Sequence, residues 1–113
     1  MKTTLEQPIC KVDPNGTKRW YQNGKRHRIN GPAIEYPNGS KHWFQNDKRH
    51  RIDGPAVVYP SGEKHWYLNG KLHRINGPAV VYPNGTKYWY LNGKEVTEQY
   101  VMRQSLLIMF III

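Results

Sequence analysis

Three copies of a His-Arg dipeptide are the residues in this sequence best suited to chemistry. They occur at His27-Arg28, His50-Arg51 and His73-Arg74, and each is followed two residues later by Gly-Pro-Ala. A guanidinium group binds phosphate through two parallel hydrogen bonds, and an imidazole ring can ligate metals or transfer protons. The motif therefore raises three kinds of chemistry to test: anion binding, metal binding and acid–base catalysis.

Lysine and tryptophan recur with the same period. Trp43 and Trp66 each stand two residues after a lysine, so each pair shares one face of a predicted strand. Aromatic rings stack on bases and neighbouring cations bind phosphate, which favours a nucleotide or single-stranded nucleic acid as ligand. The competing interpretation is structural, with the ring in the core and the lysine stem lying over it. The predicted ligand-binding residues are Arg28, Arg51, Arg74, His27, His50, His73, Trp43, Trp66, Lys41 and Lys64.

Metal binding and catalysis are not expected. Equivalent histidines lie two or three strands apart, on the order of 10–14 Å, whereas zinc needs every ligand near about 2.1 Å; we expect them to bond turn carbonyls instead. Each carboxylate in the repeats is missing from the equivalent place in other copies, so a paired-carboxylate mechanism lacks its two fixed acids. The single cysteine, Cys10, has no evident activating partner. We predict a protein that is not an enzyme, with no catalytic residue, metal or cofactor.

Length and charge narrow the remaining classes. The chain has 113 residues, 17 Lys+Arg against 8 Asp+Glu, a formal net charge of +9, and 38% hydrophobic residues. This allows one small domain and excludes a large α/β enzyme core with long buried strands. The positive charge favours anionic partners such as nucleic acid, nucleotide phosphates, acidic lipid or an acidic protein.

A repeat of 23 residues organises the chain. Tryptophan recurs at Trp20, Trp43, Trp66 and Trp89, and the Gly-Pro-Ala motif keeps the same period. Because repeats of this kind indicate tandem supersecondary units, the period also sets the predicted boundaries. These are an N-terminal extension at 1–13, a repeat array at 14–94 (copies 14–36, 37–59, 60–82 and a partial 83–94), and a C-terminal helix with an apolar tail at 95–113.

Each copy is predicted to form short antiparallel strands joined by tight turns. In the third copy, residues 56–59 and 63–68 are strand-like, and Pro60-Ser61-Gly62 and Asn69-Gly70 follow them. Asn-Gly accepts the positive φ values of a type I′ hairpin turn. Isolated hairpins are marginal in water, so neighbouring copies must stack on one another. The predicted fold is all-β, an antiparallel meander of tandem 23-residue β-hairpin repeats with a short C-terminal helix.

The pattern changes after Lys94. Residues 95–105 contain no Gly or Pro, and Thr97 can cap a helix that we place at about 97–109, covering the edge of the last copy. Residues 106–113 are all apolar, but they are too few for the roughly 20 that cross a bilayer as a helix. We expect no transmembrane span and a homo-oligomer formed through residues 106–113, in preference to peripheral membrane attachment.

The block Trp-Tyr-x-Asn-Gly-Lys-x-His-Arg-x-Asn-Gly-Pro-Ala, repeated across residues 14–94, resembles the MORN-type repeat families, including antitoxin-like members found in bacteria. It is most similar to the divergent His-Arg-x-x-Gly-Pro-Ala repeat proteins of bacteriophages and giant viruses. The resemblance implies a MORN-like elongated sheet and a non-catalytic binding role. Its viral members suggest interference with host proteins or signals.

Charge, motif and resemblance together predict a non-enzymatic binding protein. The leading hypothesis is a phage-encoded inhibitor of host defence that captures an anionic small molecule, such as a signalling nucleotide, in the host cytoplasm. One alternative is a protein–protein interaction module that binds and inhibits a host enzyme or toxin. The other is a repeat protein that binds nucleic acid.

Overall fold

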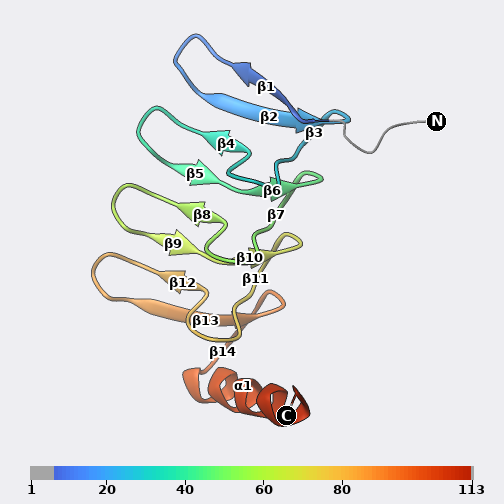
Figure 1. Ribbon diagram of the computed structural model, residues 1–113. Helices are drawn as coiled ribbons and strands as arrows, with labels where there is room; N and C mark the ends of the chain where they lie inside the picture. The colour runs from blue at the N-terminus through green and yellow to red at the C-terminus, as the bar shows by residue number, and fades with distance from the viewer. Residues whose placement is uncertain (1–6, 113) are drawn as a thin grey trace, which may run out of the picture.

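The computed structural model describes residues 7–112, which form a stack of β-hairpins followed by a helix (Figure 1). Successive copies of the repeat lie one below the other, and the C-terminal helix lies at the end of the stack (Figure 1). The elements are β1 (Ile9–Val12), β2 (Lys18–Gln22), β3 (Lys25–Arg26), β4 (Ile34–Glu35), β5 (Lys41–His42), β6 (Phe44–Gln45), β7 (Lys48–Arg49), β8 (Val57–Val58), β9 (Lys64–His65), β10 (Tyr67–Leu68), β11 (Lys71–Leu72), β12 (Val80–Val81), β13 (Lys87–Leu91), β14 (Lys94–Val96) and α1 (Glu98–Ile112).

One antiparallel sheet runs the length of the stack. Its strand order is β1-β2-β4-β5-β8-β9-β12-β13-β14, with β3 paired to β2. The hairpins β6–β7 and β10–β11 form separate two-stranded sheets beside it. The predicted all-β meander with a short C-terminal helix is therefore confirmed.

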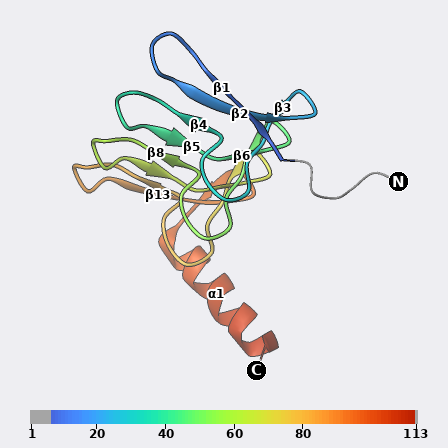
Figure 2. The ribbon, with the colours of Figure 1, turned by 45° about the horizontal axis from the view of Figure 1, so that its top comes forward.

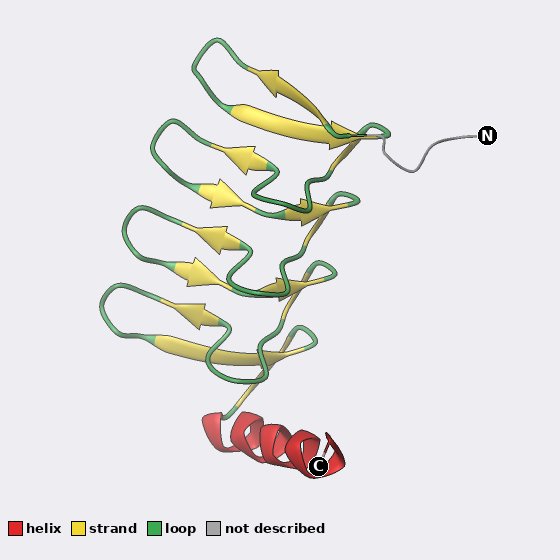
Figure 3. Cartoon of the chain, in the orientation of Figure 1, coloured by secondary structure: helices red, strands yellow, loops and turns green. Residues whose placement is uncertain are grey.

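Each repeat period contains two hairpins. Strand β8, at the end of the second copy, pairs with β9 of the third copy, and β10 then pairs with β11 across Asn69 and Gly70. Both turn residues have positive φ, 50° and 81°, as predicted for this turn. Figure 3 shows the consequence: wide loops lie along one margin of the stack and tight turns along the other. A third kind of loop carries Gly-Pro-Ala and returns the chain to the sheet.

The core is a thin line of small residues along the stack. Its strands are too short to enclose a single large centre, so the same few positions are buried in each copy. A row of aromatic rings follows the same line, with each Tyr–His or Tyr–Tyr pair edge-to-face and centroids 5.4 to 6.3 Å apart. The ring row is Tyr36, His42, Tyr59, His65, Tyr82 and Tyr88. The buried apolar residues are Ala33, Ile34, Phe44, Ala56, Val57, Ala79, Val80 and Val101.

The two ends of the stack differ. Strand β1 lies within the predicted N-terminal extension and pairs with β2, so residues 9–12 belong to the sheet; residues 1–6 lie outside the described part of the chain. At the other end, the Tyr100 amide donates to Thr97 Oγ1 at 3.1 Å, which confirms the predicted cap. Helix α1 runs to Ile112, beyond the predicted end at 109, and residue 113 is not described. Over residues 7–112, no helix has the length and apolarity needed to cross a membrane.

Candidate functional site

Each predicted arginine stacks on the tryptophan of its own copy. The guanidinium carbon of Arg51 lies 3.9 Å from the Trp43 ring centroid, and Arg51 Nη1 donates to the Pro55 carbonyl at 3.0 Å. A guanidinium over an indole face is the most favourable form of cation–π contact. The same 3.9 Å stack occurs in the first and third copies, as Arg28 on Trp20 and Arg74 on Trp66.

A glycine leaves space for this guanidinium. A Cβ atom added at Gly54 would lie 2.9 Å from the guanidinium carbon of Arg51, and the equivalent distances at Gly31 and Gly77 are 3.0 and 2.8 Å. We name each set of tryptophan, arginine, glycine and proline carbonyl an arginine clamp. The clamp gives a physical reason for the Arg-x-x-Gly-Pro spacing, because the arginine lies between the ring and the glycine of its own loop.

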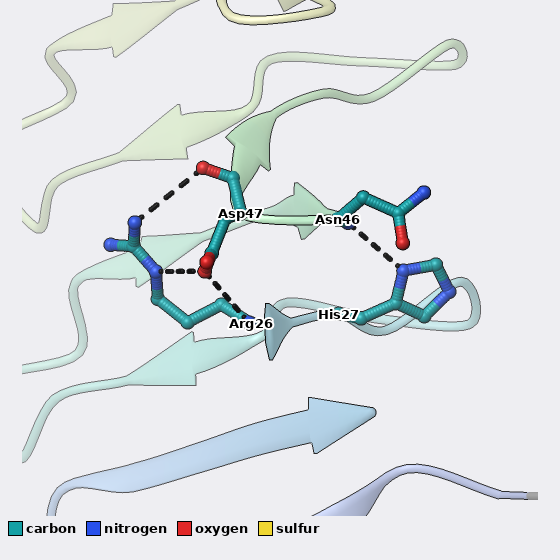
Figure 4. Close-up of polar contacts among 4 residues, drawn as sticks. All are labelled: Arg26, His27, Asn46 and Asp47. Carbon is teal, nitrogen blue, oxygen red and sulfur yellow. Dashed lines mark hydrogen bonds and ion pairs between the residues drawn. The ribbon is translucent and has the colours of Figure 1, made fainter. Parts of the chain in front are cut away.

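Each predicted histidine connects its copy to the tight turn of the next. His27 Nδ1 accepts a hydrogen bond from the Asn46 amide at 3.1 Å (Figure 4). His50 and His73 accept in the same way from Asn69 and Asn92, at 3.0 and 2.9 Å. The expectation that these histidines bond turn carbonyls is wrong, because the ring nitrogen accepts from a turn N–H. Their role in joining the copies is structural.

The Asn46-Asp47 turn, which replaces the usual Asn-Gly, adds an ion pair between copies. Asp47 Oδ1 accepts from the Arg26 side chain at 2.9 Å and from the Arg26 amide at 2.8 Å (Figure 4). These hydrogen bonds to Arg26 lower the pKa of the Asp47 carboxyl. The sequence showed this turn as a departure from the repeat, but it did not reveal the partner 21 residues earlier.

The two predicted lysines lie on the exposed surface of the sheet. Lys41 stands between Glu35 and Val58 on neighbouring strands, and Lys64 pairs with Val58 and Val81. Cross-strand partners point to one face, so these lysines continue a row along the stack. The full lysine row is Lys18, Lys41, Lys64 and Lys87.

A cleft of about 610 Å³ opens between the second and third Gly-Pro-Ala loops. Arg51, Trp66, His73 and Arg74 all line it, so the structure brings four of the predicted residues together. Trp43, Lys41 and Lys64 are not among its lining residues. The volume falls within the range of small-molecule sites.

Two arginines give this cleft a positive charge, which a nearby carboxylate reduces. Arg51 Nε contacts Asp53 Oδ1 at 3.2 Å, and the Asp53 side chain is 86% exposed. In the next copy, Arg74 Nε donates to Asn76 Oδ1 at the same distance. Burial lowers the pKa of the Arg74 guanidinium, but an arginine stays charged at neutral pH. Asp53 is not among the predicted site residues, although it is the acidic residue in a place that other copies fill with Asn.

Two further clefts lie over tryptophans at the ends of the stack, with different lining residues. A cleft of about 460 Å³ over Trp20 is lined by His27 and Arg28. Another, of about 440 Å³, lies between Trp89 and α1. Among the described residues, no group of three or more His, Cys, Asp or Glu side chains is placed to hold a metal ion.

Comparison with protein-family models, with curated proteins and with solved structures finds no match for this chain.

Proposed function

We propose that this chain is a non-enzymatic binding protein that captures an anionic ligand, such as a signalling nucleotide, in the clefts between successive Gly-Pro-Ala loops. The observation that supports it most directly is the cleft lined by Arg51, Trp66, His73 and Arg74. The arginines would bind phosphate, and the exposed parts of the aromatic and aliphatic side chains would contact the base.

The arginine clamp supports this proposal because it fixes the guanidinium groups before a ligand arrives. In Arg51, Nη1 faces Pro55 O and Nε faces Asp53, so Nη2 is the nitrogen from which a phosphate would accept a hydrogen bond. A side chain that is already ordered loses less conformational entropy on binding. The clamp therefore serves both the fold and the proposed site.

In this proposal the protein acts by sequestration, as a phage-encoded inhibitor that removes a defence signal in the host cytoplasm. The resemblance of the repeat block to viral and bacterial MORN-like proteins supports the biological role, and the positive clefts support the charge of the ligand. Capture needs no catalytic group.

The substitution Asp53→Asn tests the site directly. It removes the negative charge from the cleft and places there the residue that the chain uses at Asn30 and Asn76. Asn76 makes the same contact with Arg74 that Asp53 makes with Arg51, so the loop should keep its conformation. We expect affinity for the bound nucleotide to rise about 3- to 10-fold, as for removal of one partly screened like-charge contact. Titration calorimetry with a panel of linear and cyclic nucleotides measures this affinity for the wild type and the variant.

Glu95→Gln is the matched control. Glu95 is exposed on β14 and lies outside the lining of the cleft. The substitution therefore removes one negative charge without changing the site. Its effect on affinity should be less than 2-fold at physiological ionic strength, since exposed charges are screened within about 8 Å. Equal effects of the two substitutions, or no binding or thermal shift across the nucleotide panel, would contradict capture in this cleft.

The exposed lysine row favours nucleic acid as the second candidate. Its members recur once per copy, two strands apart, or about 10 Å. If a polyanion follows this row, affinity for single-stranded DNA should fall steeply with salt, and Lys64→Gln should reduce the salt slope by about one charge. Under the nucleotide proposal, Lys64→Gln leaves affinity nearly unchanged.

A further inference from the structure

The tips of the Gly-Pro-Ala loops carry a row of exposed isoleucines. Ile29, Ile52 and Ile75 occupy the same position of the motif in successive copies, about 10 Å apart. Ile52 is 84% exposed, whereas Ile75, beside α1, is 40% exposed. We name Ile29, Ile52 and Ile75 the isoleucine row. Large aliphatic side chains arranged in register on a surface are typical of an interface.

Helix α1 carries a second uncovered apolar surface. Val101 is 2% exposed and faces the stack, and the Ser105 hydroxyl on the same side donates to the Ile75 carbonyl. At 100° per residue, Leu107 and Phe110 fall on the opposite side of the helix, with Arg103 between them. Leu107 is 51% exposed and Phe110 is 79% exposed. We name them the outer face of α1.

The chain itself shows that α1 and a Gly-Pro-Ala loop are complementary. The cleft over Trp89 has Ile75 and Pro78 on one side and Met102 and Leu106 of α1 on the other. This contact accounts for the lower exposure of Ile75 relative to Ile52. The first two loops have the same sequence pattern as the third, but α1 of the same chain does not reach them.

We propose that the outer face of α1 in one copy packs on Ile29 and Ile52 of a second copy, and that the reverse contact closes a symmetric dimer. In Figure 2, α1 projects away from the sheet. The side chains of its outer face are exposed, so a neighbouring molecule can reach them. Reciprocal exchange covers both apolar surfaces in both copies, whereas an open chain of copies leaves one of each uncovered at its ends. This inference deepens the predicted homo-oligomer by naming the surface that receives Leu107 and Phe110.

The dimer would also affect the clefts. Ile52 and Ile75 line the cleft over Trp66, so a partner helix seated on Ile52 lies at its mouth. This consequence rests on the proposed function. The dimer itself does not rest on it, because dimerisation is measured without any ligand.

Site-directed disulfide formation tests the contact. In a Cys10→Ser background, one chain carries Ile52→Cys and another carries Phe110→Cys. Both positions are highly exposed, so neither substitution should disturb folding, which circular dichroism checks. Mixing the two under mild oxidation should give a cross-linked heterodimer as the main product. Lys25→Cys, at an exposed tight turn, replaces Ile52→Cys as the control and should give little product.

Sedimentation velocity of charge variants gives an independent measurement. Ile52→Glu and Phe110→Glu should each weaken dimerisation at least 10-fold, because each places an unpaired charge in an apolar contact. Mixing Ile52→Lys with Phe110→Glu should restore a dimer. Ile9→Glu, at an exposed isoleucine outside both surfaces, should dimerise like the wild type.

Three results would overturn the proposal. A monomeric wild-type chain at micromolar concentration would remove the dimer. Cross-linking of Phe110→Cys with itself, together with normal dimerisation of Ile52→Glu, would show that two α1 helices pack on each other. A monomer that binds vesicles of anionic lipid, and loses this binding with Phe110→Glu but not with Ile52→Glu, would show that α1 inserts into a membrane surface.

Discussion

The arginine clamp gives each residue of the Arg-x-x-Gly-Pro motif a physical role. Arg51 fills the space between the Trp43 ring and Gly54, and its Nη1 satisfies the Pro55 carbonyl. A loop without regular secondary structure is thereby held by one side chain. Lysine has no planar donor group to stack on the ring while bonding the carbonyl, so arginine is the required residue.

The clamp predicts a strong energetic coupling between Arg51 and Gly54. Gly54→Ala should reduce the free energy of unfolding by about 1–3 kcal/mol, because the new Cβ forces the guanidinium off the ring. In an Arg51→Ala background the same change should cost little, since the group it meets is gone. Urea denaturation of the four proteins in this double-mutant cycle measures the coupling.

The control for the cycle is Gly54→Ala combined with Arg103→Ala, an arginine on α1 that is not part of any clamp. The effects of these two substitutions on the free energy of unfolding should be additive. Additivity in the Gly54 and Arg51 pair would mean that the glycine serves the backbone of the loop and not the guanidinium.

The sequence identified which site residues recur, but it did not identify their contacts. A period of 23 shows that Arg28, Arg51 and Arg74 are equivalent. It does not show that each turns back onto a tryptophan eight positions earlier, because that depends on the path of the loop between Arg and Ala. The contact of Asp53 with Arg51 was missed for the same reason.

At the scale of elements, local chemistry explains what could be predicted. The tight Asn-Gly turns and the Thr97 cap follow from side chains and φ preferences within a few residues; the cap is confirmed, and so are the turns at 23–24, 69–70 and 92–93. At 15–16, 38–39 and 84–85 only the glycine has a positive φ, so these pairs form a different turn. The division of the long strand at Trp66 is not local. Its amide donates to Ala79 O at 2.7 Å and its carbonyl accepts from His73 at 3.0 Å, so the strand changes partners at this residue.

His42, the buried member of the ring row, makes the sheet sensitive to acid. Burial lowers the pKa of His42 to about 4, with further lowering by the nearby Arg49, His65 and Arg26 charges. In the unfolded chain its pKa is near 6.5. The folded state therefore disfavours the protonated form, and stability is unaffected above pH 6.5 and falls as the pH drops from 6.5 to 4. Below pH 4 this residue causes no further loss.

Urea denaturation of His42→Tyr and of the wild type at several pH values measures this loss of stability. Tyrosine already occupies the equivalent place in the last copy, at Tyr88, and it cannot carry a positive charge. The full shift in the His42 pKa corresponds to about 3 kcal/mol of unfolding free energy, and partial water access to the ring reduces the expected loss to about 1–2 kcal/mol. Between pH 6.5 and pH 4, the free energy of unfolding should therefore fall more steeply for the wild type than for His42→Tyr. Parallel curves over that range would place the charged imidazole of His42 in a solvated site.

On the scale of the whole molecule, stability passes from copy to copy. The bonds between copies join neighbours: His50 Nδ1 accepts from Asn69, and the Gly70 amide donates to Arg49 O. Such an array behaves as a sum of repeat and nearest-neighbour terms, and its ends open first. The fourth copy has no His-Arg loop after it, and α1 takes that place beside Trp89.

Removing packing between α1 and the last copy should therefore loosen one end of the array. Val101→Ala deletes two buried methyl groups, which destabilises the contact by about 1–2 kcal/mol. Amide hydrogen exchange should become about 5- to 30-fold faster in β12 and β13, with little change in β1 and β2. The effect on exchange should decrease along the stack in this way because each copy depends on its neighbours and only weakly on distant copies.

Met109→Ala is the control, because Met109 is exposed on the same helix and does not line the cleft between α1 and Trp89. It should change exchange in β12 and β13 by much less than Val101→Ala does. If Val101→Ala instead accelerates exchange equally in β1, β2, β12 and β13, the array unfolds as one cooperative unit. In that case α1 stabilises the whole sheet, and the nearest-neighbour description fails for this length of array.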